Sequence, residues 1–149
     1  DSCWRESRNH LRNEMLFALV MLVVLLVWAR AASMVHVFFP VGEELGVLGW
    51  VEFLAVGSAV GSIFAAIVFS SSVVALPMML DRNTDAITSA LTSVAAVFQN
   101  KGVMALWAAL IGSLMLIGFV TAYIGLVLVL PLIGHATWHA YRETVKESE

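Results

Sequence analysis

The sequence predicts an all-α fold, namely a polytopic membrane helical bundle with about four transmembrane helices and one amphipathic surface helix. Of the 149 residues, 60% are hydrophobic and 13% are charged, and the mean hydropathy is +0.90. Soluble domains average about 45–50% apolar and about 25% charged residues, so this excess is too large for an ordinary soluble core. The apolar residues also form long runs, and about 20 consecutive apolar residues span the hydrocarbon core of a bilayer. We therefore expect one integral-membrane domain over residues 1–149.

The first predicted span covers residues 15–39, where only Arg30 and His36 interrupt the apolar run. A Pro-Val-Gly turn at residues 40–42 and the acidic sequence "GEELG" follow it. The second predicted span covers residues 53–80, is rich in small residues and contains Pro77 near its end. As one helix it would rise about 42 Å against about 30 Å of hydrocarbon. We therefore expect it to tilt, to kink at Pro77 or to emerge at the far side.

The amphipathic helix is predicted near residues 84–99, because its apolar and polar residues fall on different sides of a helix. Asn83 or Thr84 is expected to cap its start, and Gly102 suits its end. The pattern fits a helix lying along the membrane surface, and it equally fits a loop helix packed on the spans.

The last apolar region, residues 103–133, carries no charge and is too long for one span. We divide it at "GFVTAYIG", which gives two predicted spans near residues 103–117 and 123–139. Both spans would be short.

The distribution of basic residues supports four spans. With four spans, the N-terminal segment, the surface helix and the C-terminal tail share one side of the membrane. That side receives seven of the eight Lys and Arg residues, namely Arg5, Arg8, Arg12, Arg82, Lys101, Arg142 and Lys146. Basic residues favour the cytoplasmic side, so both termini are expected there. Arg30 is the exception and can extend its side chain toward the outer surface.

Two histidines four residues apart, His135 and His139, share one face of the last predicted helix. They could ligate a haem or a metal ion, although zinc normally takes three or four protein ligands. The alternative is a belt at the membrane–water interface, where Trp138, Tyr141 and Arg142 would act as anchors at headgroup level. The sequence favours the belt and predicts no metal site.

Small residues form a strip along the second predicted span. Gly57, Gly61 and Ala65 recur every four residues, with Ser58 and Ser62 beside them. In lipid, helices associate where small residues let their backbones approach closely. We expect this strip to be a helix-packing interface, either within the chain or with another subunit, with a pore lining as a third possibility.

The composition argues against several functional classes. The middle of every predicted span lacks Asp, Glu, Lys and His, which intramembrane catalysis and ion-coupled transport usually require. No catalytic residue is therefore predicted. A net charge of −3 with scattered basic residues gives no nucleic-acid surface. The single cysteine, Cys3, excludes an internal disulfide framework.

Two segments carry a resemblance to a known family. A Pro-x-x-Leu-Asp-Arg segment is formed by Pro77, Leu80, Asp81 and Arg82, and the chain closes with Gly-His-Ala-Thr-Trp-His-x-Tyr-Arg over residues 134–142. The sequence resembles the C-terminal part of the bacterial family of predicted integral-membrane proteins called domain-of-unknown-function 2189, mainly over residues 50–142. The resemblance implies a bacterial cytoplasmic (inner) membrane location and further spans before Asp1. It implies no activity.

The leading functional hypothesis is an accessory or structural subunit, surrounded by membrane lipids, that docks a protein partner or forms a homo-oligomer. The first alternative is a permease- or channel-like unit that forms a passage as an oligomer. The second is a haem- or metal-binding subunit of a redox complex that uses His135 and His139. No resident cofactor is expected under the leading hypothesis.

Overall fold

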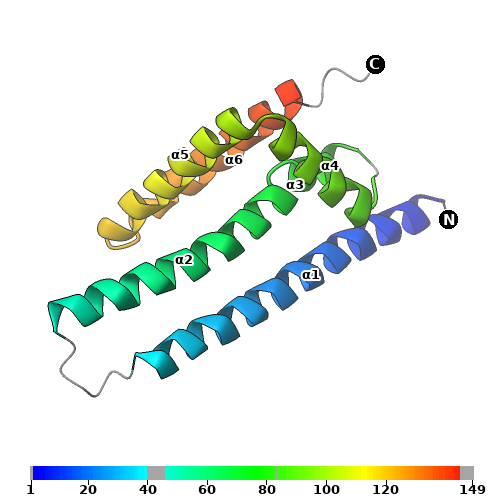
Figure 1. Cartoon of the computed structure of the whole chain (residues 1–149). Coiled ribbons are helices and arrows are strands. Elements are labelled where there is room, and N and C mark those ends of the chain that lie inside the picture. The colour runs from blue at the N-terminus through cyan, green and yellow to red at the C-terminus, as the bar shows by residue number, and fades with distance from the viewer. Residues whose placement is uncertain (1, 40–45, 83, 145–149) are drawn as a thin grey trace. The chain divides into compact units, whose positions relative to one another are not determined.

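The chain is all-α, a membrane helical bundle, in a computed structural model that describes residues 2–39, 46–82 and 84–144 (Figure 1). No strand occurs in these three ranges. The described helices are α1 (Ser2–Phe38), α2 (Val47–Ser72), α3 (Ala75–Asp81), α4 (Ala86–Gln99), α5 (Lys101–Val120) and α6 (Leu126–Thr144). The predicted turn at residues 40–42, the acidic residues Glu43 and Glu44, Asn83 and Lys146 lie outside the described residues.

Three helical segments are long and apolar enough to cross a membrane, namely Leu11–Phe38, Val47–Asp81 and Lys101–Val120. They overlap the predicted spans at 15–39, 53–80 and 103–117. Helix α6 covers residues 126–139 of the fourth predicted span, whose first three residues lie in the preceding turn, and it is not among the three segments; its second half carries His135, His139 and Arg142, which lower its hydropathy. The count of four spans stays a prediction.

The chain divides into two compact units, Asp1–Val68 and Phe69–Glu149. The first unit contains α1 and most of α2. Three aromatic contacts converge on Phe53 of α2, whose ring centroid lies 5.2 Å from His36, 5.9 Å from Phe39 and 6.1 Å from Trp50. These rings join the end of α1 to the beginning of α2.

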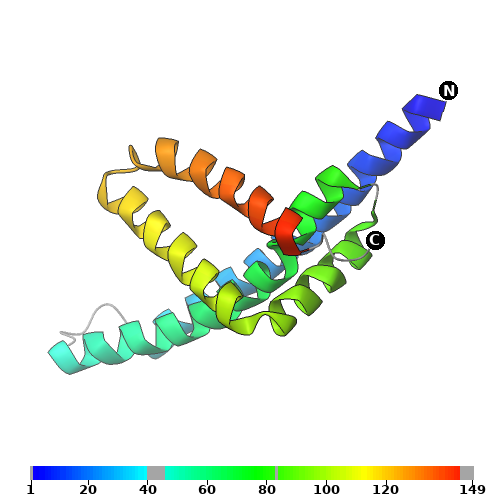
Figure 2. The ribbon, with the colours of Figure 1, turned by 90° about the horizontal axis from the view of Figure 1, so that it is seen from above.

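The second unit holds α3, α4, α5 and α6. Helix α3 packs on α4 and on α6, and α4 also contacts α5. Helices α5 and α6 form a hairpin whose two arms separate with distance from their turn (Figure 2). The short helix α3 therefore joins the C-terminal half of α6 to α4.

The predicted second span does not continue as one helix to its end, because a break at Val73 and Val74 separates α2 from α3. Pro77 is the third residue of α3, within its first turn. A proline lacks the amide hydrogen, and its ring clashes with the carbonyl four residues earlier, here that of Val73. Pro77 thus causes α2 to end before it, at Ser72, and itself lies in the first turn of α3, where a proline is tolerated.

Residues 121–125, inside "GFVTAYIG", form the turn between α5 and α6, and that both helices cross the membrane stays a prediction. The Thr121 hydroxyl donates to the carbonyls of Ile117 and Gly118, at 3.0 Å each, and accepts from the Gly125 amide at 3.0 Å. Ala122 and Tyr123 have positive φ angles of 51° and 68°. The turn is closed by one side chain and by two residues in the left-handed region.

The predicted caps of the amphipathic helix are wrong. The cap of α4 is Asp85, whose Oδ2 accepts from the Thr88 amide at 3.0 Å. At the other end α4 stops at Gln99, and α5 begins at Lys101, so Gly102 is inside α5. Asn100 ends α4 instead: its backbone and side-chain amides both donate to the Ala96 carbonyl, at 3.1 and 3.2 Å.

Candidate functional site

The break between α2 and α3 leaves a backbone amide for another element to bind. The Val74 amide donates to the Ser93 hydroxyl of α4 at 3.0 Å, and Ser93 is 0% exposed. A buried backbone amide without a partner costs about 1–3 kcal/mol, so this hydroxyl stabilises the break. A residue 19 positions away thus supplies the acceptor that the interrupted helix lacks.

A small apolar core surrounds this hydrogen bond. Val74, Met78 and Tyr141 are 2%, 8% and 2% exposed and form one cluster. The partly buried residues packed against it are Val73, Ala96 and Trp138. The cluster fixes the C-terminal half of α6 against α3.

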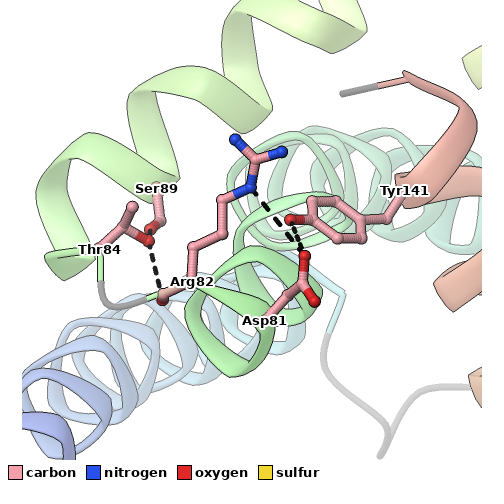
Figure 3. A network of polar contacts seen from close by, with 5 residues as sticks. All are labelled: Asp81, Arg82, Thr84, Ser89 and Tyr141. Carbon is pink, nitrogen blue, oxygen red and sulfur yellow. Dashed lines mark hydrogen bonds and ion pairs between the residues drawn. The ribbon is translucent and has the colours of Figure 1, made fainter. Parts of the chain in front are cut away.

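A polar contact also joins α6 to α3. We call the contacts among Val74, Ser93, Asp81 and Tyr141 the junction. The Tyr141 hydroxyl donates to Asp81 Oδ2 at 3.0 Å, and Arg82 Nε lies 4.0 Å from that oxygen (Figure 3). Tyr141 lies beyond the predicted span 123–139. Burial raises the pKa of Tyr141 above its ordinary value of 10.0, the Asp81 hydrogen bond and charge raise it further, and Arg82 opposes them. The arrangement keeps the phenol protonated, so it acts as a hydrogen-bond donor.

Helix α4 presents three faces. Its buried face consists of small and hydroxyl residues, Ala86, Ser89 and Ser93. The large apolar side chains point away from this face, since Ile87, Leu91 and Phe98 are 64%, 66% and 63% exposed. A polar exposed strip is formed by Asp85, Thr88 and Gln99. Helix α4 packs on α3, as the prediction of a loop helix packed on the spans requires. It also has the separated apolar and polar faces that the prediction of a membrane-surface helix requires.

The start of α4 is held by hydroxyl contacts as well as by its cap. Thr84 Oγ1 lies 2.9 Å from Ser89 Oγ and near the Arg82 carbonyl (Figure 3). The hydrogen bonds that Asp85 accepts from Thr88 lower the pKa of this carboxyl below its ordinary value of 3.8. The ionised cap also suits the positive end of the helix dipole.

The two predicted ligand histidines lie close together. His135 Nε2 and His139 Nε2 are 3.1 Å apart, their ring centroids are 4.7 Å apart, and both side chains are exposed. Among the residues that the structure describes, no group of three or more His, Cys, Asp or Glu side chains could hold a metal ion. The sequence brings these two nitrogens together but provides no third ligand within the described part of the chain.

The predicted interface anchors occupy different surroundings. Tyr141 is buried, and its ring lies 5.8 Å from that of Trp138, which is partly buried in the same core. Arg142 is exposed. Tyr141 and Trp138 therefore contact α3 and its neighbours, and contact with lipid headgroups stays a prediction for all three residues.

The small-residue strip faces open space within the first unit. Among the described residues, no atom outside the helix's own turns lies within 4 Å of a Cβ built on Gly57 or Gly61. Ser62 donates to the Ser58 carbonyl at 2.7 Å, inside α2. Gly61 and Ala65 line an apolar groove of about 530 Å³ between α1 and α2, together with Phe64, Met21, Leu25 and Trp28. Tight packing of this strip stays a prediction.

Sequence reasoning missed the partners of the junction. The sequence pattern places Ser89 on the polar side of the amphipathic helix, whereas the structure buries it at 0% exposure. The pattern gives Ser93 no role and does not pair Asp81 with Tyr141. The available signal was the spacing of Ser89 and Ser93, which places two hydroxyls on one helix face beside Ala86. Nothing in the sequence shows that Asp81 and Tyr141, 60 positions apart, would meet.

Among the comparisons with known proteins, one gives a match, and it is to a protein family. No curated protein and no solved structure shows significant similarity to this chain. The sequence model of domain-of-unknown-function 2189, described as predicted integral membrane protein, matches residues 2–81, which is more than half of the chain. The matched part includes Pro77, Leu80 and Asp81 and stops before Arg82. It lies further toward the N-terminus than the resemblance over residues 50–142 suggested. The family-type ending at 134–142 stays a prediction. The chain belongs to the domain-of-unknown-function 2189 family of integral membrane proteins.

Proposed function

We propose that this chain is an accessory subunit that docks a transmembrane helix of a partner protein in the bacterial cytoplasmic membrane. The observation that carries the proposal is the open space in front of Gly57 and Gly61, beside the groove between α1 and α2. The groove is lined by apolar side chains, and both helices contain candidate spans, so its occupant lies in hydrocarbon. Its chemistry suits an apolar helix and offers nothing to a charged substrate.

The small residues favour a protein helix over a lipid chain as the occupant. In a bilayer, burying apolar surface against another helix gains little over burying it against lipid, so helix pairs depend on close backbone contact. Gly61 and Ala65 belong both to the predicted strip and to the groove lining. A helix that approaches there can bring its backbone near that of α2. A flexible acyl chain has no helix backbone, so it does not require small residues at its binding surface.

We also propose a multi-pass arrangement of four spans with both termini in the cytoplasm. The distribution of Lys and Arg supports it. The three faces of α4 agree with a position at the cytoplasmic surface, because Ile87, Leu91 and Phe98 can enter lipid while Asp85 and Thr88 remain in water. Attachment of a reporter to either terminus tests this proposal, and a periplasmic signal from either would overturn it.

Site-specific photo-crosslinking from α2 tests the docking proposal. A photoreactive residue at Leu54, which is 59% exposed and lies on the same face of α2 as Gly61, should form an adduct with a second membrane polypeptide at native expression. Gly61→Leu should abolish the adduct because a leucine side chain blocks backbone approach. Ala59→Leu, on the opposite side of α2, is the matched control and should leave the adduct unchanged.

Two results would overturn the docking proposal. One is the absence of any polypeptide adduct when the chain is inserted and stable. The other is an adduct between two copies of this chain alone, which would replace a partner protein with a homo-oligomer.

A further inference from the structure

The histidine pair on α6 is a cluster of metal-ligating side chains that the docking proposal leaves unused. His135 and His139 are separated by one helical turn, and their Nε2 atoms converge to 3.1 Å. Both are exposed, whereas Trp138 and Tyr141, on a neighbouring face of the helix, are held in the core of the second unit. The packed face fixes the helix and leaves the imidazole pair accessible.

The separation of the two nitrogens fits one metal ion. With metal–nitrogen bonds of about 2.0–2.1 Å, two nitrogens 3.1 Å apart subtend an angle of about 100° at the metal. This angle lies between the 90° of square-planar or octahedral neighbours and the tetrahedral value of about 109°. The distance between the two nitrogens, at which they hydrogen-bond each other in the metal-free chain, thus already suits adjacent ligand positions on one ion.

The same separation does not fit a haem held by both histidines. Two axial imidazoles lie on opposite sides of the iron, so their nitrogens are about 4 Å apart, with the porphyrin plane between them. Nitrogens 3.1 Å apart on one helix face leave no room for that plane. A compact ion with adjacent ligand positions is the better match.

We propose that His135 and His139 together bind one divalent first-row transition-metal ion through their Nε2 atoms. Imidazole nitrogen is a preferred ligand of Zn²⁺, Cu²⁺ and Ni²⁺. Two protein ligands are fewer than a structural zinc site uses, so water fills the other positions and the ion exchanges readily. The site does not depend on the docking function, because α6 and the groove are in different units.

Calorimetric titration with Zn²⁺ tests the site on the full-length chain, purified in detergent without a histidine tag and freed of metal with a chelator. We expect one ion per chain. His135→Gln and His139→Gln should each weaken binding about tenfold or more, since even the loss of an outer-shell partner of a metal ligand costs about 10–100-fold.

Two controls separate this site from other metal-binding groups. The double variant His139→Ala with Ala140→His keeps the number of histidines but moves one off the shared face, and it should bind as weakly as the single variants. His36→Gln changes a histidine of α1, in the other unit, and should bind Zn²⁺ as the wild-type chain does. Equal binding by the double variant and the wild-type chain would overturn the proposal.

A measurement on the unmodified chain removes any dependence on how the variants fold. Diethylpyrocarbonate modifies accessible imidazoles, and mass spectrometry identifies the modified residues. Zn²⁺ should protect His135 and His139 together. Protection of neither residue, or no saturable heat in the titration, would overturn the proposal.

Discussion

The hydroxyl of Tyr141 donates a 3.0 Å hydrogen bond to the carboxylate of Asp81, 60 positions earlier in the chain. Asp81 is the last residue of α3, and Tyr141 lies near the end of α6, so the bond joins two helices at their C-terminal ends. Tyr141 is 2% exposed, and its ring also belongs to the core with Val74 and Met78. One side chain therefore provides both an apolar contact and a polar contact at the same junction.

Tyr141→Phe separates these two contributions. The phenylalanine ring keeps the apolar packing and loses the bond to Asp81, whose side chain is 40% exposed and can be hydrated. We expect a loss of about 0.5–1.5 kcal/mol in the free energy of unfolding, measured by thermal or denaturant unfolding in detergent. Tyr123→Phe, at a residue 66% exposed, is the matched control and should be close to neutral. Equal stability of the two variants would show that the hydrogen bond contributes nothing.

Alkaline pH should weaken the same junction. The pKa of Tyr141 is raised by burial and by Asp81, so the folded chain holds this proton more tightly than the unfolded chain does. The contribution to stability is therefore complete below pH 10.0 and is lost as pH rises through the raised pKa. The ultraviolet absorbance of tyrosinate in the Tyr123→Phe variant reports on Tyr141 alone. Ionisation at or below pH 10.0 would contradict the structure.

Ser93→Ala should destabilise the break between α2 and α3. It removes the acceptor of the Val74 amide at a site that is 0% exposed, and it leaves a buried donor unpaired. We expect a cost of about 1–3 kcal/mol in the free energy of unfolding. Ser113→Ala removes an exposed hydroxyl that only bonds the Ala109 carbonyl of its own helix, and it should be nearly neutral. A neutral Ser93→Ala would mean that water replaces the hydroxyl.

Gly125→Ala should destabilise the hairpin of α5 and α6. A Cβ at residue 125 would collide with the Thr121 hydroxyl and approach the Gly118 Cα to 3.3 Å. Overpacking of this kind costs about 1–3 kcal/mol. Gly112→Ala is the matched control: no described atom outside its own helix turns lies within 4 Å, and alanine is the better helix former by about 1 kcal/mol. Opposite signs for the two variants, measured as changes in melting temperature, are the expected result.

The helical elements could be predicted from the sequence because their signal is local. Long apolar runs gave the three candidate spans, and "GFVTAYIG" gave the position of the α5–α6 turn. The family could also be identified, and of the two segments that suggested it the one at Pro77, Leu80 and Asp81 lies inside the matched residues. These features depend on residues that are neighbours in the chain.

The junction could not be predicted because its contacts join distant residues. Pro77 interrupts the helix at Val73 and Val74. The Val74 amide therefore needs an acceptor, which comes from α4. Ser93 met that requirement, although a serine in an amphipathic helix is usually assigned to the solvated face. The cap of α4 could not be chosen from the sequence for a smaller reason, since several neighbouring polar residues suit this position. In the structure the Asp85 carboxylate accepts from the Thr88 amide.

The turn after α5 restricts which residues the chain tolerates at its tip. Ala122 and Tyr123 both have positive φ, and neither is glycine. A β-branched side chain is strongly disfavoured in this conformation, whereas glycine and asparagine adopt it readily. Drift at these two positions should therefore run toward glycine or asparagine and away from valine and isoleucine, even though the surrounding sequence is rich in both and the two side chains are exposed.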